Sequence, residues 1–189
     1  MTYLSLARRV ASATALTVLS ATSYAQSNVI ANGSFELGMA SWSTNGFFLQ
    51  GYDFGIDDDA QSGASAFYGG AVQNLGFLNQ SFTTVVGQAY SVSFWLANDG
   101  YQPNQFQVLA NGDVLMDIQN IAILPYTLYQ TTFTARSAGS ALQFAFRNDS
   151  GLLHLDNVAV TAVPEVSPAL MLVIGLATMA VRRRTRRGL

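Results

Sequence analysis

The segment YSVSFWLA, residues 90–97, alternates two kinds of position along eight residues. Large apolar side chains occupy every second position: Tyr90, Val92, Phe94 and Leu96. The positions between them hold Ser91, Ser93, Trp95 and Ala97. Successive side chains of a β-strand point to opposite faces of its sheet, so the first series is expected to be buried and the second to face outward. The segment therefore predicts a half-buried β-strand.

The same two-residue period recurs along the middle of the chain, in the segments 105–108, 129–134 and 142–147. Asn111-Gly112 stands between two such runs and favours a two-residue hairpin, because both of its turn positions need a positive φ. Further turns are expected at 98–100, 137–139 and 148–151. About eight or more short strands, spaced roughly 8–12 residues apart, predict an all-β fold. We expect an antiparallel β-sandwich of the jelly-roll type over residues 26–163.

The charges are distributed unevenly along the chain. The formal net charge is −2, from nine basic and eleven acidic residues. Seven of the nine basic residues lie near the two ends, so residues 26–163 keep only Arg136 and Arg147 against ten acids, a charge of about −8 (2 − 10). Such a surface repels phosphate backbones, which excludes nucleic acid as a natural partner. It suits divalent cations and neutral, hydroxyl-rich ligands. Cysteine is absent, which excludes disulfides and thiolate chemistry.

The first 25 residues have the features of a secretory signal peptide. Arg8-Arg9 precede a small, apolar run from Val10 to Ser20, and Ser23-Tyr24-Ala25 follows. Small residues at Ser23 and Ala25 match the positions that signal peptidase reads, so cleavage is expected after Ala25. The alternative, a retained membrane anchor, needs a longer apolar run.

The last residues, 164–189, combine three features: Pro164-Glu165, an uncharged apolar stretch over 166–181, and a terminal arginine cluster that includes Arg182, Arg183 and Arg184. As a helix the stretch is about 24 Å long at roughly 1.5 Å per residue, short of a bilayer core of about 30 Å. An ordinary core helix is the alternative, but such helices have a polar face.

This layout resembles the PEP-CTERM sorting signal, although Val166 stands where that family usually has a third motif proline, with Pro168 two places later. The resemblance covers the last 26 residues and implies recognition by exosortase, a membrane-embedded transpeptidase-like enzyme. It further implies a protein of a Gram-negative-type bacterium that is anchored transiently in the inner membrane by a short apolar helix. The protein is then passed to the cell surface or the extracellular matrix.

A second resemblance brackets the middle region. Residues 28–42 (NVIANGSFELGMASW) and 153–160 (LHLDNVAV) are similar to the opening and closing segments of galactose-binding-like carbohydrate-binding modules. In those modules the first and last strands pair, and calcium is held between them. Carried over residue by residue, the resemblance implies a structural calcium ion held by Glu36 and Asp156, with backbone oxygens near 32–34 and Asn157. The alternative is that both carboxylates are solvated edge residues.

Sugar binding needs an aromatic platform beside planar polar side chains, because rings stack on sugar C–H faces while amides, arginine and carboxylates reach the hydroxyls. The alternation directs Trp95 outward, and Tyr101 follows it in a loop. The same alternation directs Gln107, Gln143 and Arg147 outward on their own strands. These five residues form the expected carbohydrate face; Trp42 is expected in the core. The alternative places Trp95 under a loop and makes the glutamines ordinary outward residues.

Catalytic motifs are missing from the sequence. The sequence has a single histidine, His154, which would have to act as the base in any serine–histidine mechanism. No nucleophile elbow, zinc-protease motif or phosphate-binding glycine loop occurs. Asp57-Asp58-Asp59 favours a solvated acidic turn over a metal site. The leading hypothesis is therefore a secreted, non-catalytic protein that binds exopolysaccharide. The other two hypotheses are a structural matrix or surface-layer protein without a glycan pocket, and a glycoside hydrolase, which needs two convergent carboxyls.

Overall fold

The structure, a computed structural model, describes residues 27–48 and 53–164. The expected signal peptide (1–25) and most of the sorting tail, with Glu165, the apolar stretch 166–181 and Arg182, Arg183 and Arg184, lie outside the described residues. Pro164 is the last described residue and is exposed. Within the two described ranges, no helix is long and apolar enough to cross a membrane.

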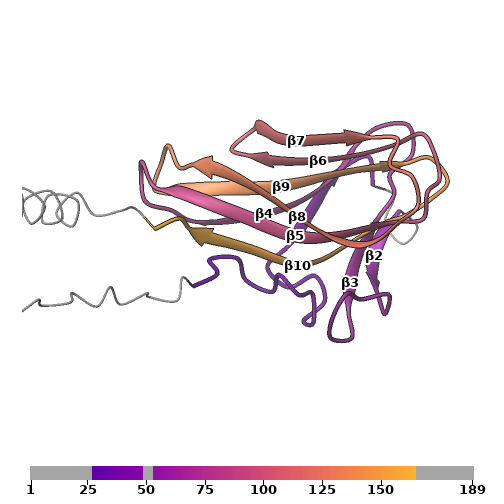
Figure 1. Cartoon of the computed structure of the whole chain (residues 1–189), viewed down its shortest axis with the longest axis horizontal. Coiled ribbons are helices and arrows are strands. Elements are labelled where there is room, and N and C mark those ends of the chain that lie inside the picture. Colours follow the sequence, from indigo (N-terminus) through magenta and orange to yellow (C-terminus); the bar gives the residue numbers. More distant parts are fainter. Residues whose placement is uncertain (1–26, 49–52, 165–189) are drawn as a thin grey trace, which may run out of the picture.

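The described residues fold into two five-stranded antiparallel sheets, which confirms the all-β sandwich of the jelly-roll type (Figure 1). Sheet A has the order β1 (Ser43–Gly46), β4 (Gly76–Thr83), β9 (Gly139–Asn148), β6 (Asn104–Ala110), β7 (Asp113–Gln119). Sheet B has the order β2 (Phe54–Asp57), β3 (Ala66–Gly69), β10 (Leu153–Ala162), β5 (Ala89–Asn98), β8 (Leu124–Thr134). Consecutive strands therefore alternate between the sheets at several points, as in Greek-key connections.

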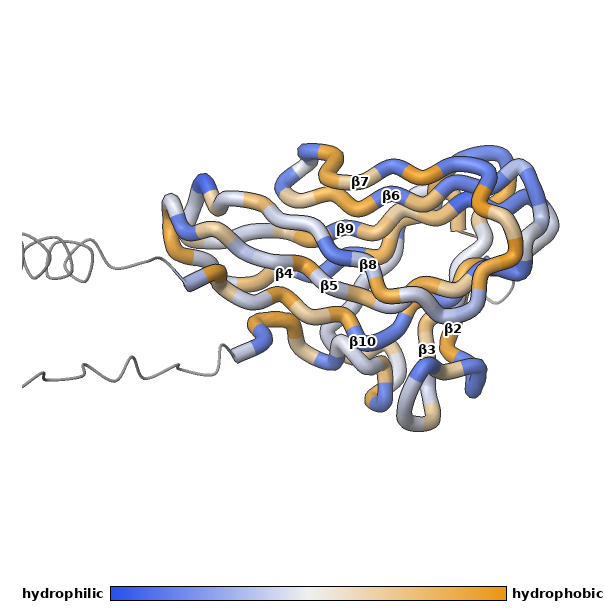
Figure 2. The backbone as a smooth tube through the Cα atoms, in the orientation of Figure 1, coloured by the Kyte–Doolittle hydropathy of each residue, from blue (hydrophilic) through white to orange (hydrophobic). Residues whose placement is uncertain are grey.

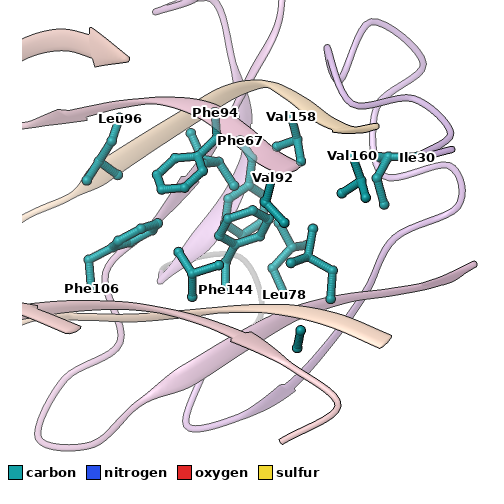
Figure 3. Packing of buried hydrophobic residues seen from close by; sticks show 14 of the residues in the cluster. Ile30, Phe67, Leu78, Val92, Phe94, Leu96, Phe106, Phe144, Val158 and Val160 are labelled. Atoms are coloured by element: carbon teal, nitrogen blue, oxygen red, sulfur yellow. The ribbon is translucent and has the colours of Figure 1, made fainter. Parts of the chain in front are cut away.

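The core lies between the two sheets and consists largely of aromatic rings. Figure 2 shows the alternation of apolar and polar residues along the strands, and Figure 3 shows buried residues of both sheets meeting in the middle. In β5 the predicted inward series is buried, with Val92, Phe94 and Leu96 fully inaccessible. Phe94 meets Phe144 of β9 edge-on, with ring centroids 5.3 Å apart. Such aromatic pairs add about 0.5–1.5 kcal/mol beyond their buried area.

The predicted hairpin is confirmed between β6 and β7. Asn111 and Gly112 have φ values of 53° and 86°, the left-handed conformation that this turn requires. The backbone N–H of Asn111 donates to Ala141 O (2.9 Å), and its side-chain oxygen accepts from Ala141 N (2.9 Å), so the turn is also bound to β9.

The opening segment differs from the expected strand. Residues 28–42 form a series of turns, in which Asn32 and Phe35 adopt positive φ. The segment nevertheless runs beside β10, because Val29 N donates to Val160 O (2.9 Å) and Val158 N donates to Gly33 O (2.8 Å). A side chain at Gly33 is excluded, since its Cβ would lie 2.0 Å from Val158 O. The close approach of two backbones replaces strand pairing here.

Trp42 lies in the core, as predicted. It is 7% exposed and stacks on Phe35 with ring centroids 5.4 Å apart. Its indole Nε1 donates to Asn32 O (2.9 Å), which satisfies the one polar atom that the ring carries inward.

Candidate functional site

The five residues of the expected carbohydrate face do not share a face. Trp95 lies on the outer surface of sheet B, in strand β5. Gln107 in β6, and Gln143 and Arg147 in β9, lie on the outer surface of sheet A. Because the inner surfaces of the two sheets pack on each other, Trp95 is on the opposite side of the sandwich from the other three. The expectation of one common face is therefore corrected.

The error has a simple physical origin. Each of these side chains does alternate with buried neighbours, so its outward direction was predicted correctly. Alternation predicts which side chains of a strand face outward, but it does not predict which of the two sheets contains the strand. The jelly-roll connections send β5 to one sheet and β6 and β9 to the other.

The outer surface of sheet A presents a cluster of amide side chains around one carboxylate, which we name the amide face. Its members come from all five strands of the sheet: Asn45, Asn79, Gln105, Gln107, Asp117, Gln119 and Gln143. Direct strand pairing places Asn79 opposite Gln143, and Gln107 opposite Asp117. Sequence reasoning found only two of these seven residues, because single Asn and Gln residues on a strand carry no signal until the sheet order is known.

One half of the amide face is a row of linked amides. Gln143 Nε2 donates to Asn79 Oδ1 (2.7 Å), and Asn79 Nδ2 donates to Asn45 Oδ1 (3.0 Å). These bonds cross from β9 through β4 to β1, and Asn79 Nδ2 also donates to the backbone oxygens Ser43 O (3.2 Å) and Phe77 O (3.3 Å), which sets the orientation of the Asn79 amide. The row therefore offers acceptors and donors in a set order along the sheet.

The other half centres on Asp117. Gln105 Nε2 donates to Asp117 Oδ1 (2.9 Å), and Gln119 Nε2 donates to Oδ2 (3.4 Å). The hydrogen bond from Gln105, with further ones from Gln107 and Gln119, lowers the pKa of Asp117 below its ordinary value against a smaller opposing effect of burial. Asp117 is therefore a charged acceptor at neutral pH.

Phe77 supplies an apolar side chain beside the row of amides, on strand β4 and opposite Asn45 of β1. It is half-buried and lies opposite Ala145, which in turn lies opposite Gln107. The ring also lies against β1, because a Cβ at Gly46 would come within 2.8 Å of Phe77 Cδ2. The amide face thus combines one partly exposed ring with flanking amides and a carboxylate.

Arg147 and Tyr101 lie at one end of sheet A. Arg147 Nη2 is 2.5 Å from Asp149 Oδ2, and this guanidinium lowers the pKa of Asp149. The loop that carries Tyr101 reaches the same place, because Asp149 N donates to Pro103 O (3.1 Å). Tyr101 is 59% exposed. Arg147 is already paired, so it is less available to a ligand than expected.

The outer surface of sheet B carries Trp95 and an acidic cluster that sequence reasoning did not assemble. His154 Nε2 lies 3.0 Å from Asp57 Oδ2 and 3.9 Å from Asp59 Oδ2. The Tyr126 hydroxyl donates to Asp59 O (2.5 Å), and burial together with the nearby carboxylates raises its pKa. Asp57 and Asp59 therefore contact side chains of β10 and β8, while Asp58 and Asp59 remain exposed, as the prediction of a solvated acidic turn requires.

Glu36 and Asp156, the predicted calcium ligands, are brought together around the loop 61–65. Asp156 has no exposed surface, and its Oδ2 accepts from Gln61 N (3.0 Å) and Ser62 N (3.1 Å). Glu36 Oε1 accepts from Ala64 N (2.9 Å) and Ser65 N (3.1 Å). Burial raises the pKa of Asp156 above its ordinary value, and the charge of Glu36 raises it further, against the lowering by the backbone N–H groups.

This pair lacks a cationic side chain in the part of the chain that the structure describes. Arg136 pairs with Asp113 (2.8 Å), Arg147 pairs with Asp149, and His154 faces Asp57. No group of three or more His, Cys, Asp or Glu side chains among the described residues is arranged to hold a metal. An ion between Glu36 and Asp156 therefore needs backbone or amide oxygens as well, which calcium accepts. The donor chemistry fits a hard cation.

No protein-family model matches the sequence, and no curated protein matches it. Solved structures of the same fold do match. One is the carbohydrate-binding module TmCBM61 in complex with β-1,4-galactotriose, at 13% identity, covering 72% of this chain and 99% of that one, with a TM-score of 0.59. Another is the K3 cleaved adhesin domain of Lys-gingipain from Porphyromonas gingivalis (19%; 72% and 98%; 0.55).

A third match is the CBM22-1–GH10 portion of the Clostridium thermocellum endo-1,4-β-D-xylanase 10B, complexed with xylohexaose (13%; 72% and 29%; 0.57). Carbohydrate-binding modules thus recur among the similar structures, and some of these modules belong to catalytic proteins. At these identities the likeness is one of fold.

Proposed function

We propose that this chain is a secreted, non-catalytic glycan-binding protein whose binding surface is the amide face of sheet A. The observation that carries the proposal is the arrangement on that face: a half-buried ring, Phe77, beside a linked row of amides, with the charged acceptor Asp117 on the same face of the sheet. The recurrence of carbohydrate-binding modules among structures of the same fold supports it.

The chemistry of the amide face suits a neutral polysaccharide. Sugar C–H groups stack on an aromatic ring, and each hydroxyl both donates and accepts, as an amide does. Asp117, charged at neutral pH, would accept hydrogen bonds from sugar hydroxyls at the lone pairs that Gln105 and Gln119 leave free. The absence of lysine and the acidic body disfavour anionic polymers. β-1,4-Galactan and xylan are the first probes, since similar structures hold galactotriose and xylohexaose.

The test is affinity electrophoresis of the purified protein in gels that contain β-1,4-galactan, xylan or the exopolysaccharide of the producing cells. Gln107→Ala and Gln143→Ala should each weaken retention about tenfold, since each removes a bidentate amide worth roughly 1–1.5 kcal/mol. Trp95→Ala is the matched control, because it lies on the opposite face. Loss of retention in Trp95→Ala, with both glutamine variants unchanged, would contradict the amide face and move the site to sheet B.

A structural calcium ion at Glu36 and Asp156 is the second part of the proposal. The motivation is a buried carboxylate beside a second one without a cationic partner among the described residues. The two residues come from the first and the last segments of the sandwich. A cation between the two carboxylates would attract both of them and so remove their mutual repulsion. It would thereby link the first segment of the domain to the last.

The third part concerns location. The residues 1–25 would be removed by signal peptidase, and the tail 164–189 would be recognised by an exosortase-type membrane protease after transient anchoring in the inner membrane. The protein would then act at the cell surface or in the extracellular matrix. The charge distribution supports this division, because removing both ends leaves an acidic body with only Arg136 and Arg147 as cations. A matrix of neutral polysaccharide is a suitable setting for such a body.

A further inference from the structure

The sandwich has four sheet edges, and they are not equally protected. Strands β1 and β7 end sheet A, and strands β2 and β8 end sheet B. An edge strand exposes backbone N–H and C=O groups that another strand can pair with. Proteins protect such edges by making them short, by placing charges or proline on them, or by covering them.

Three of the four edges carry such protection. Strands β1 and β2 are each four residues long. Strand β7 carries Asp113 and Asp117, and Asp113 is paired with Arg136 at 2.8 Å. At β7 an incoming strand of a second molecule would meet charged side chains, and at β1 and β2 it would find only four residues to pair with.

Strand β8 is the exception. It is eleven residues long, LPYTLYQTTFT, and carries no charged side chain. Pro125 interrupts only its first end, so nine residues, Tyr126–Thr134, remain without charge or proline. Aromatic and β-branched residues make up most of this stretch, which is the composition that favours strand pairing.

Along β8, the backbone N–H and C=O groups of successive residues point alternately toward β5 and toward the open edge. Ala135, directly after the strand, bonds toward the β5 side: Ala135 N donates to Gln88 O (2.9 Å), and Gly87 N donates to Ala135 O (2.9 Å). In an antiparallel ladder every second residue bonds to the same neighbour, so the odd-numbered residues of β8 bond to β5. The N–H and C=O groups of Leu128, Gln130 and Thr132 therefore point to the open edge.

We propose that the β8 edge pairs with the same edge of a second copy of this chain, antiparallel, about a two-fold axis at Gln130. This axis opposes Leu128 with Thr132 of the second copy and uses the whole stretch Tyr126–Thr134. A second copy fits because the stretch opposes itself without placing like charges together. Two acidic bodies repel least where they meet through uncharged strands.

The dimer goes beyond glycan binding by one molecule. It joins two copies of sheet B into one continuous sheet and places two amide faces in one particle. Two linked sites bind a polymer more tightly than either site alone, because the second binding step becomes intramolecular. The dimer itself needs no glycan, so it can be tested independently of the proposed function.

The first test is sedimentation velocity of the full chain, without glycan, in a mild detergent that keeps the apolar stretch 166–181 dispersed. The parent should sediment as a dimer that dissociates on dilution. Gln130→Lys should weaken the dimer about tenfold or more, because two lysines would oppose each other at the axis. Gln119→Lys, the same change on edge strand β7, should sediment as the parent does.

The second test uses the absence of cysteine in the chain. Gln130→Cys places single thiols next to each other across the proposed axis, and a mild oxidant should convert the variant into a covalent dimer. Gln119→Cys is the control and should remain monomeric under denaturing conditions. A monomeric parent at every soluble concentration, or equal cross-linking of both cysteine variants, would overturn the proposal. The cysteine pair also keeps the test decisive if Gln130→Lys fails to fold.

Discussion

Asp156 is a carboxylate without exposed surface, held by three backbone N–H groups and close to a second carboxylate. Two opposing effects act on it: burial and Glu36 disfavour its charge, and the N–H groups favour it. Burial has the largest effect, so without a cation the folded protein binds a proton at Asp156 more readily than the unfolded chain does. We therefore expect the residue to respond to pH and, if the proposed calcium site holds, to cations.

Without a cation, we expect stability from Asp156 to increase on acidification. Its pKa in the folded protein lies above the ordinary 3.8, so its stabilising contribution is complete below 3.8 and is lost as pH rises through the higher folded value. With calcium the sign reverses, because the ion binds only the charged carboxylate and acid displaces it. Urea unfolding at pH 7 and pH 5, with chelator and with calcium, measures both slopes.

Asp156→Asn is the variant that isolates these effects. It should remove the acid-induced gain in chelator and also remove the gain in melting temperature that calcium gives to the parent. Glu36→Gln should remove the calcium effect but keep a pH dependence from Asp156. Equal melting temperatures of the parent in calcium and in chelator would contradict the calcium site, whatever the pH slopes.

At the scale of elements, the turn between β6 and β7 depends on a single conformation. Gly112 has a φ of 86°, and a Cβ there would meet no atom within 4 Å. Gly112→Ala should therefore cost only the left-handed backbone penalty, about 1–2 kcal/mol. The midpoint of urea unfolding measures the loss.

Gly139→Ala is the matched control for that prediction. Gly139 begins β9, its φ is outside the positive range, and the nearest atom to its Cβ would be Phe82 O at 4.0 Å. Alanine there should leave stability unchanged or raise it slightly, because it restricts the unfolded chain. Equal stability of the two alanine variants would show that the turn tolerates another conformation.

The strands themselves were predictable because their information is local. The inward series of β5, the Asn111-Gly112 turn and the inward rings of β9 all follow from alternation and turn chemistry. The opening segment 28–42 was not predictable as turns, because its path depends on Gly33 meeting Val158 across the fold. Local patterns carry no record of such distant contacts.

The candidate site shows the same limit more strongly. Trp95 was correctly predicted to face outward, but its sheet was not predictable. Asn79 and Asp117 gave no signal in the sequence, since the amide face exists only after β4, β9, β6 and β7 lie side by side. Glu36 and Asp156 were predicted as ligands through a resemblance of the two bracketing segments; both accept hydrogen bonds from the loop 61–65, and their role as calcium ligands stays a prediction.

At the scale of the whole molecule, the two ends of the described chain leave the sandwich on the same side (Figure 1). Near the end of the described chain, Val163 is bound on both sides: Val163 N donates to Ala89 O (2.7 Å), and Gln88 Nε2 donates to Val163 O (2.7 Å). The pairing of β10 with β5 therefore extends to Val163.

The proposed processing of both ends predicts a definite mass for the protein recovered from cells. We expect a chain that begins at Gln26 and ends near Glu165, with the apolar stretch and the arginine cluster removed. Intact-mass spectrometry of the cell-surface fraction measures both boundaries at once. A mass that retains residues 1–25 would contradict the signal peptide, and one that retains Arg182–Arg184 would contradict the processing of the tail.

The position of β10 has a mechanical consequence. The strand runs between β3 and β5, pairs with β5 through eight residues on either side of a register shift between Asp156 and Ala159, and leads directly to the boundary at Val163 and Pro164. A force that pulls on Pro164 along the strand loads these interstrand bonds together, in shear, instead of opening them one after another. If the protein is attached through this end and binds a polymer through the amide face, the load passes from sheet B through the aromatic core to sheet A. The interstrand bonds of β10 would then resist the load together before any strand separates.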